Sequence, residues 1–280
     1  MIYVFGSILG VLALFPLRRL MLTGWVMFNQ AKHVFRPGMR AVVCSPSDIG
    51  LSYESFTLPV DKNAFITGWL VPGRKNRPGN RWHVLFCHGN GGTIGDLLEV
   101  ANVITDLGFS ITLFDYRGYG ASTGCPSEAN TIEDACVCYR YLVEQRGIPK
   151  DRLIWFGHSL GAAVACQAAA LVSGGMLVME GSFTSIPAMA RLRYPRLPVG
   201  LYCKFLYDNL AAVGTVSIPV MVVHSREDQT CPFDHGQAIY AAAREPKCFV
   251  EISGGHDNGG LLTNPSYRQA LLDYAAEWLA

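Results

Sequence analysis

A serine, an aspartate and a histidine occur in this chain in an order and a setting suited to acyl transfer. Ser159 stands in the motif Gly-His-Ser-Leu-Gly, after the apolar run 153–156 and before the alanine-rich stretch 160–172. A serine between a strand and a helix in Gly-x-Ser-x-Gly lies on a turn so tight that only glycine fits the flanking positions. Because a serine hydroxyl is a weak nucleophile at neutral pH, it needs a base and an acid that orients the base. The motif predicts that Ser159 is the nucleophile and that both partners follow it.

The general base is expected directly after the last predicted strand. His235 and His256 are the two histidines that follow both Ser159 and a suitable acid. His256 lies in Ser-Gly-Gly-His-Asp after the apolar run 248–252, whereas His235 begins a helix next to a proline. The carboxyl ends of parallel strands meet at one edge of a sheet, where Ser159 is also expected. We therefore predict that His256 is the general base.

The acid is expected at the same edge, one strand away. Asp228 follows the run 220–224 after the short loop Ser-Arg-Glu. Glu227 precedes it, and Glu180 ends the strand that follows the serine motif. We predict that Asp228 orients His256, with Glu227 and Glu180 as alternatives. Three further histidines near these motifs are expected to have structural rather than catalytic roles: His88, His158 and His224.

Acyl transfer also needs hydrogen-bond donors for the negatively charged oxygen of its intermediate. One donor is expected to be the backbone N–H of Leu160, which follows the nucleophile. The other is expected from the loop His-Gly-Asn-Gly-Gly after the run 84–87, where glycine lets the backbone approach a substrate. We assign it to the N–H of Asn90, with Gly89 and Gly91 as alternatives. This chemistry requires no metal and no organic cofactor, and the sequence assigns no substrate-binding residue.

Short apolar runs alternate with longer amphipathic stretches from residue 56 onward, and these elements would position the residues above. The first two runs, 56–60 and 65–71, are joined by a polar turn and predict an antiparallel pair. The later runs lack polar alternation, which is typical of buried parallel strands joined by helical crossovers. The pattern predicts an α/β fold with a mostly parallel, doubly wound sheet and antiparallel N-terminal strands. The later strands are expected at 84–87, 110–114, 153–156, 176–179, 220–224 and 248–252, and helices at 94–107, 131–144, 160–172, 234–243 and 267–279.

Two connections stand out from this alternation. Residues 183–218 separate two predicted strands and are longer than a single crossover helix requires. A connection of that length in a compact domain is usually functional, so we expect a short helical cap over the carboxyl edge of the sheet. Its apolar side chains fit an acyl pocket and fit ordinary packing equally well. Residues 73–81, with their basic side chains, are expected to form the solvated tip of a hairpin.

The composition excludes several classes of protein. Half of the 280 residues are hydrophobic and 16% are charged, which is too apolar for an intrinsically disordered chain. The 23 basic and 22 acidic residues leave no excess charge for a nucleic acid, so no nucleic-acid partner is expected. Nine cysteines, an odd number scattered through apolar segments and loops, indicate a reducing compartment rather than a disulfide framework.

The N-terminal segment differs from the rest of the chain. The uncharged run from Ile2 to Leu17 precedes Arg18 and Arg19, and no acidic residue occurs before Asp48. A signal peptide carries its positive charge before the apolar run, so this order favours an uncleaved helix that anchors the chain in a membrane, with its body on the cytoplasmic side. A helix docked on the domain surface and a cleaved signal are the alternatives. The predicted division is an anchor at 1–28, a basic juxtamembrane linker at 29–49 and a catalytic domain at 50–280.

Several motifs of the chain occur together in one known family. They are the loop 88–92, the segment Asp115–Glu128, Gly-His-Ser-Leu-Gly-Ala-Ala-Val-Ala at 157–165, Glu-Gly-Ser-Phe-Thr-Ser-Ile at 180–186, the loop with Asp228 and Pro232, and Gly-Gly-His-Asp at 254–257. Over residues 50–280 the chain resembles the Bem46-like branch of the α/β-hydrolase superfamily. The resemblance implies a serine hydrolase with an N-terminal hydrophobic anchor, related to depalmitoylases that act on cysteine thioesters. The chain departs from the branch at Asp257-Asn258, often Asn-Asp, and at Ser225, often glycine.

The expected reaction is hydrolysis of an ester or thioester of an apolar acyl group through an acyl-enzyme. The expected partners are a small-molecule or acylated-protein substrate, and a membrane at the N-terminus. An amidase or peptidase would use the same three residues, so it remains an alternative. A non-catalytic membrane scaffold with the same fold is a second alternative, which the presence of all three residues disfavours.

Overall fold

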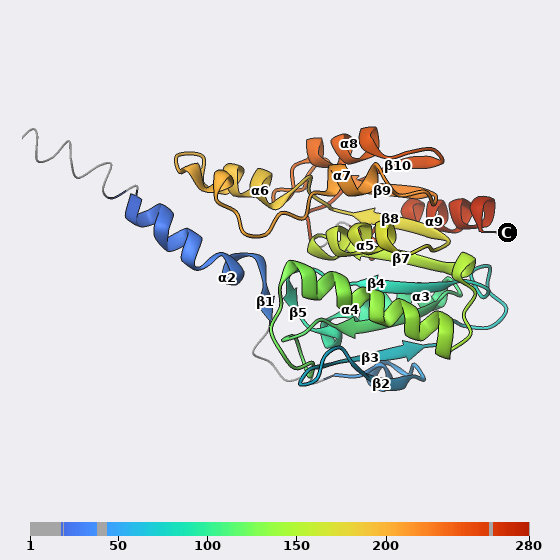
Figure 1. The fold of residues 1–280 in the computed structure, drawn as a ribbon. Coiled ribbons are helices and arrows are strands. Elements are labelled where there is room, and N and C mark those ends of the chain that lie inside the picture. The colour runs from blue at the N-terminus through green and yellow to red at the C-terminus, as the bar shows by residue number, and fades with distance from the viewer. Residues whose placement is uncertain (1–17, 19, 38–43, 258–259, 280) are drawn as a thin grey trace, which may run out of the picture.

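The computed structural model describes residues 18, 20–37, 44–257 and 260–279, and its centre is a twisted sheet of eight strands (Figure 1). Along the chain these strands are β2 (Glu54–Pro59), β3 (Phe65–Val71), β4 (His83–Cys87), β6 (Ser110–Asp115), β7 (Leu153–His158), β8 (Met176–Glu180), β9 (Val220–Ser225) and β10 (Lys247–Ile252). In space their order is β10-β9-β8-β7-β4-β6-β3-β2. The β2–β3 and β3–β6 pairs are antiparallel and the other pairs are parallel. The predicted fold class is confirmed.

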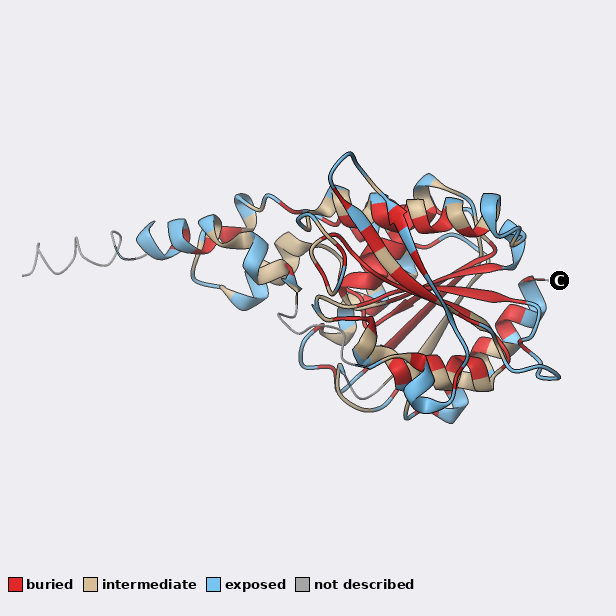
Figure 2. Cartoon of the chain, turned by 90° about the horizontal axis from the view of Figure 1, so that it is seen from below, coloured by how far each residue is buried: buried red, intermediate tan, exposed pale blue. Residues whose placement is uncertain are grey.

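Helices cover both faces of this sheet (Figure 2). One layer contains α4 (Glu128–Arg140), α5 (Leu160–Leu171) and α8 (Phe233–Ala242), and the other contains α3 (Leu98–Asp106) and α9 (Pro265–Trp278). Consecutive strand residues therefore enter different cores. Leu85 and Cys87 pack with the first layer, whereas Val84 and Phe86 pack with the second. Burial on both faces is the reason that these strands show no polar alternation in the sequence.

Two of the predicted helices change type along their length. The helix expected at 94–107 is a 3-10 turn, η2 (Ile94–Leu97), followed by α3, and the helix expected at 131–144 is α4 followed by a π-helical turn, η3 (Tyr141–Gln145). α4 begins earlier than predicted because the Ser127 hydroxyl caps it by accepting the N–H of Asn130 at 3.1 Å. A further 3-10 turn, η4 (Lys150–Arg152), leads into β7.

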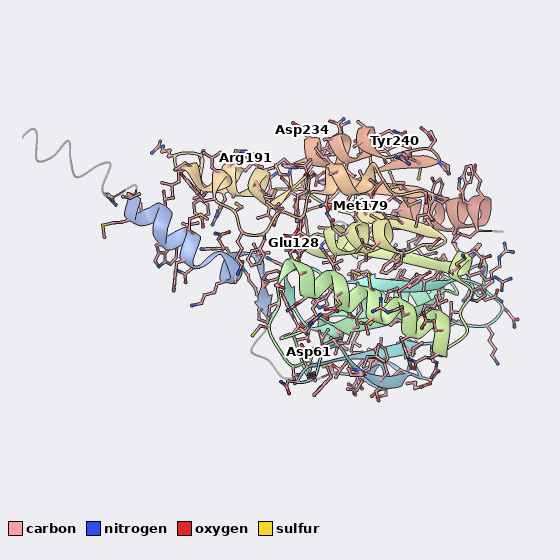
Figure 3. The ribbon with its side chains drawn as sticks, viewed as in Figure 1. Asp61, Glu128, Met179, Arg191, Asp234 and Tyr240 are labelled. Carbon is pink, nitrogen blue, oxygen red and sulfur yellow. The ribbon has the colours of Figure 1, made fainter. Side chains whose placement is uncertain are left out.

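The connection at 183–218 forms the predicted helical cap. It contains α6 (Ile186–Arg193), the 3-10 turn η5 (Pro198–Leu201) and α7 (Asn209–Val213). The Glu128 carboxylate, at the start of α4, accepts the backbone N–H groups of Leu206 and Tyr207, each at 2.6 Å. Figure 3 labels Glu128 at this junction and Arg191 on α6. These bonds fasten the cap to the body of the domain.

The prediction of a hairpin tip at 73–81 is wrong. β3 and β4, which this segment connects, are not neighbours, because β6 lies between them and pairs with both. Turn residues and basic side chains suit any solvated connection. They do not reveal that a later strand inserts between the two that they join.

The described part of the N-terminal segment is helical and contacts the cap. Residues 20–28 form a helix, followed by α2 (Gln30–Val34), β1 (Arg36–Pro37) and η1 (Pro46–Ile49), so the predicted linker contains regular structure. The Gln30 side chain donates to the Tyr202 carbonyl at 3.2 Å and accepts the Lys204 N–H at 2.6 Å. β1 pairs with β5 (Gly91–Gly92). None of the helices in the described residues is long and apolar enough to cross a membrane. The rest of the predicted anchor, residues 1–17 and 19, lies outside the described residues.

Candidate active site

Ser159 lies on a sharp turn between β7 and α5. Its backbone has φ 56° and ψ −119°, a conformation that a residue with a side chain rarely adopts. The flanking glycines are required by contact with other backbone: a Cβ on Gly157 would lie 2.2 Å from the Gly161 carbonyl oxygen, and a Cβ on Gly161 would lie 1.9 Å from the Cys87 carbonyl oxygen. The spacing of the motif is therefore a packing requirement, as the sequence predicted.

The structure brings Ser159, His256 and Asp228 together in one chain of hydrogen bonds. His256 Nε2 lies 2.8 Å from Ser159 Oγ, and His256 Nδ1 lies 2.7 Å from Asp228 Oδ2. An ionised carboxylate can only accept, so the proton of the neutral imidazole is on Nδ1 and the lone pair on Nε2 faces the serine hydroxyl. This tautomer is the one that a general base for Ser159 needs.

The environment of Asp228 keeps its carboxyl ionised. Its Oδ1 accepts the backbone N–H groups of Thr230 and Cys231, each at 2.8 Å. Burial favours the neutral carboxyl, but the hydrogen bonds from His256 and from these backbone groups outweigh it and lower the pKa of Asp228. A permanent negative charge thus lies beside the His256 ring.

The alternatives that the sequence left open have other partners. Glu227 accepts the backbone N–H of Gly254 at 3.1 Å, two residues before His256. Glu180 bonds to His158 rather than to His256. His235 Nδ1 accepts the N–H of Thr184 at 3.0 Å, and His224, which is fully buried, bonds to the Cys231 carbonyl at 2.8 Å.

The loop that carries Asn90 lies against the nucleophile turn. A Cβ on Gly89 would lie 3.8 Å from Ser159 Cβ. His88 bonds through Nδ1 to the Gly89 carbonyl at 2.8 Å, and burial lowers its pKa to about 4, so it braces the loop as a neutral ring. Leu160 is the first residue of α5, where a backbone N–H has no acceptor within the helix. Leu160 thus follows Ser159 directly, and Asn90 follows the Gly89 that faces it, so the assignment of the two oxyanion donors stays a prediction.

Two tyrosines that the sequence reasoning gave no role hold this loop from behind. The Tyr119 hydroxyl donates to the Asn90 carbonyl at 3.0 Å, and the Tyr116 hydroxyl donates to the His88 carbonyl at 3.0 Å. The Asn90 carbonyl also accepts the Arg36 N–H at 2.8 Å. Their signal in the sequence is the Asp-Tyr-Arg-Gly-Tyr-Gly segment at 115–120, which is part of the family resemblance.

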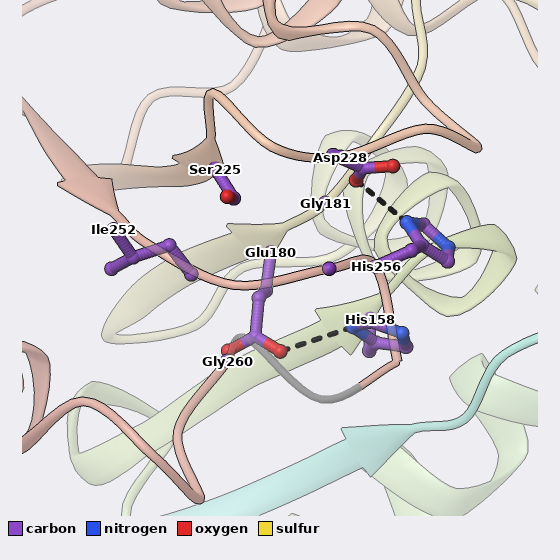
Figure 4. A pocket seen from close by; sticks show the side chains of 9 residues that line it. His158, Glu180, Gly181, Ser225, Asp228, Ile252, His256 and Gly260 are labelled. Carbon is purple, nitrogen blue, oxygen red and sulfur yellow. Dashed lines mark hydrogen bonds and ion pairs between the residues drawn. The ribbon is translucent and has the colours of Figure 1, made fainter.

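A second histidine and carboxylate pair was also missed. His158 Nδ1 lies 3.0 Å from Glu180 Oε1, and its ring centroid lies 5.0 Å from that of His256 (Figure 4). Burial opposes the charged ring, but Glu180, with Asp257 and Asp228, outweighs it and raises the pKa of His158. The signal was positional, because His158 and Glu180 end neighbouring strands and are paired in register. Both residues line a small pocket next to Asp228 and His256.

Comparison with known proteins gives consistent matches. The family model for the alpha/beta hydrolase fold matches residues 83–195. Uncharacterized protein Rv2307c of Mycobacterium tuberculosis is 32% identical over 247 residues, which is 85% of this chain and 87% of that protein. Lysophosphatidylserine lipase ABHD12 of Danio rerio is 34% identical over 185 residues, or 59% of this chain and 48% of that protein. The solved structure of the Pyrococcus furiosus esterase Pf2001 has a TM-score of 0.71 and 16% identity, and covers 88% of this chain and all of that chain.

Proposed function

The chain belongs to the alpha/beta hydrolase family, and from that premise we propose that it is a serine hydrolase of the Bem46-like branch that cleaves an ester or thioester of an apolar acyl group. One observation carries the proposal. Ser159 lies on a strained turn at the carboxyl edge of the sheet and is hydrogen bonded to His256, which is in turn hydrogen bonded to the buried Asp228. Relatives named as a lipase and as an esterase support the choice of an ester bond.

The first half-reaction makes the acyl-enzyme. Ser159 Oγ attacks the substrate carbonyl carbon while its proton moves to His256 Nε2, and Asp228 stabilises the imidazolium that forms. The N–H groups of Leu160 and Asn90 donate to the negatively charged oxygen of the tetrahedral intermediate. The intermediate collapses as the bond to the leaving alcohol or thiol breaks, and His256 returns the proton to that group.

The second half-reaction uses water in place of the serine. His256 takes a proton from the water molecule, which attacks the acyl carbon of the Ser159 ester. Collapse of the second intermediate releases the carboxylic acid and returns the proton to Ser159. The same sequence of steps hydrolyses an amide. Ester, thioester and amide substrates differ in the leaving group, so the preference for one of these bonds is tested by comparing hydrolysis of all three.

Active-site labelling tests the nucleophile. The purified chain is treated with a fluorophosphonate probe, and labelling of the wild type but not of Ser159→Ala is expected. Equal labelling of both proteins would refute the proposed nucleophile. A series of p-nitrophenyl esters of two to sixteen carbons, run beside acyl-thioester and acyl-amide peptides, then identifies the bond and the acyl length. A folded chain that hydrolyses none of them would favour the scaffold alternative.

We also propose that the chain is held at a membrane by its N-terminal segment, with the catalytic domain on the cytoplasmic side. The described helix supports this proposal, because Leu20, Trp25 and Phe28 are 70%, 59% and 91% exposed. On the adjoining cap, Leu201 is 79% exposed and Tyr202 is 60% exposed. No acidic residue occurs in 18–37 or in 184–207, which suits contact with anionic lipids.

Vesicle flotation tests this association. The full-length chain is expected to float with vesicles that contain anionic lipid, and Phe28→Glu together with Leu201→Glu is expected to reduce the bound fraction. Equal flotation of the wild type and the Phe28→Glu/Leu201→Glu variant would show that the surface around Phe28 and Leu201 does not contact the membrane. Absence of flotation in the wild type would overturn it.

A further inference from the structure

The second histidine beside the proposed base is held in the same way as the base itself. His158 donates from Nδ1 to the buried Glu180, as His256 donates from Nδ1 to the buried Asp228. The two distances are 3.0 Å and 2.7 Å, and the ring centroids are 5.0 Å apart. Figure 4 shows the two parallel arrangements side by side.

These bonds give both rings the same tautomer when they are neutral. With the proton on Nδ1, the lone pair of each ring is on Nε2, on the side away from its carboxylate. A carboxylate behind each imidazole is the arrangement that orients metal-ligating histidines and increases their basicity. The Ser159 hydroxyl is the present hydrogen-bond partner of Nε2 in His256, at 2.8 Å.

A third ligand atom stands beside the two rings. Asp257 is exposed, and one ligand atom from each of His158, His256 and Asp257 lies within 4.8 Å of the others. Zinc bound at about 2.0–2.2 Å places tetrahedral ligand atoms roughly 3.4 Å apart, so small side-chain rotations would bring the three ligand atoms to that spacing. Among the described residues that line the adjoining pocket are the carboxyl groups of Glu180 and Asp228, and none of these described residues is a lysine or arginine. The local charge therefore favours a cation.

We propose that His158, His256 and Asp257 form a reversible inhibitory site for a divalent transition metal, with Zn²⁺ as the best fit. Two imidazoles and one carboxylate suit Zn²⁺, and water would complete the tetrahedron. Coordination uses lone pairs only, so no covalent bond breaks and a chelator reverses it. The inhibitory consequence rests on the proposed function: metal bound to Nε2 of His256 removes the acceptor for the Ser159 proton.

Calorimetry measures the binding without reference to activity. ZnCl₂ is titrated into full-length Ser159→Ala, which lacks the hydroxyl that competes for His256 Nε2, in a Cys44→Ser/Cys125→Ser background because these exposed thiols also bind zinc. One Zn²⁺ per chain is expected. Adding His158→Gln is expected to weaken binding about 100-fold or more, and adding Glu180→Gln by about 10- to 100-fold. His33→Gln, which removes a histidine of α2 that is not among the proposed ligands, is the matched control and should bind like its parent.

Inhibition of hydrolysis is the second measurement. Zn²⁺ is expected to inhibit the wild type, and EDTA is expected to restore its rate. Half-inhibition of His158→Gln, measured against the metal-free rate of that variant, is expected to require about 100-fold more Zn²⁺ than half-inhibition of the wild type. Absence of binding by Ser159→Ala up to millimolar Zn²⁺, or equal binding after His158→Gln, would overturn the proposal. If the chain binds Zn²⁺ as expected but hydrolyses nothing, the metal site stands and the proposed function fails.

Discussion

Two buried carboxylates, Glu180 at the end of β8 and Asp228 in the loop after β9, allow a matched test of which one acts on the base. Asp228 and Glu180 each accept a hydrogen bond from a histidine Nδ1, but only the donor to Asp228, His256, also contacts Ser159. In the proposed mechanism, Asp228→Asn removes a negative charge beside the imidazolium that His256 would become during acylation. Glu180→Gln makes the same chemical change one strand away.

The magnitude follows from the geometry. With the charges about 4 Å apart and an effective dielectric constant of about 20, Coulomb's law gives about 4 kcal/mol. That energy corresponds to about a 10³-fold loss in kcat. Asparagine can also donate to Nδ1 and hold the tautomer that leaves no lone pair on Nε2, which adds to the loss. The Glu180 carboxylate bonds to the other ring, so Glu180→Gln is expected to lower kcat less than tenfold.

The assay is steady-state hydrolysis of a p-nitrophenyl ester, with folding checked by circular dichroism and thermal unfolding. The wild type, Asp228→Asn and Glu180→Gln are compared at the same pH in the presence of EDTA, so that metal does not affect the rates. Equal losses in the two variants, or a larger loss in Glu180→Gln, would refute the assignment of Asp228. A larger loss in Glu180→Gln would make Glu180, an alternative from the sequence, the acid.

Three further predictions concern the structure around the site. Gly161→Ala places a Cβ against the Cys87 carbonyl and is expected to lower the free energy of unfolding by several kcal/mol in denaturant titration. Gly91→Ala, whose Cβ meets open space, should change the free energy of unfolding by about 1 kcal/mol or less. Equal effects of the two variants would contradict the packing argument. Tyr119→Phe removes the hydroxyl that holds the Asn90 carbonyl and is expected to lower kcat about tenfold with little change in KM, so a change in KM alone would count against a role in positioning the oxyanion loop. Burial raises the pKa of Asp115 from about 4 to about 7. Between these pH values the folded state keeps the proton that the unfolded state loses, so the contribution of Asp115 to stability is lost as pH rises from about 4 to about 7. The difference in unfolding free energy between wild type and Asp115→Asn should fall by about 1.4 kcal/mol per pH unit over that range, and a flat difference would contradict the shift.

The proposed triad could be located from the sequence because each member follows a strand end. Ser159 is fixed by glycines whose positions admit no side chain, and Asp228 and His256 come after buried strands that must end at the same edge. Strand periodicity and the rule that parallel strands share an edge were therefore enough to bring the three together. The sequence pattern does not separate Asp228 from Glu180, because both lie at that edge and only side-chain geometry distinguishes them.

The supporting contacts could not be predicted in the same way. The bond from Tyr119 to Asn90 depends on how two loops far apart in the chain fold over each other, and no local pattern encodes that distance. The insertion of β6 between β3 and β4 is a property of the whole sheet, so the connection at 73–81 gave no sign of it. The His158 and Glu180 pair required strand register, which the sequence pattern leaves open by one residue in either direction.

The hydrogen bonds of Gln30 to the cap fix the orientation of the N-terminal helix relative to the cap. Both ends of the Gln30 amide hold the backbone at Tyr202 and Lys204, so the helix at 20–28 continues into a fixed point on the cap. Residues 20–28 form a helix roughly 13 Å long at about 1.5 Å per residue, and a turn at Asn29 leads from it into α2. If the chain is held at its N-terminus, this contact would keep the cap on the side of the domain that faces the point of attachment.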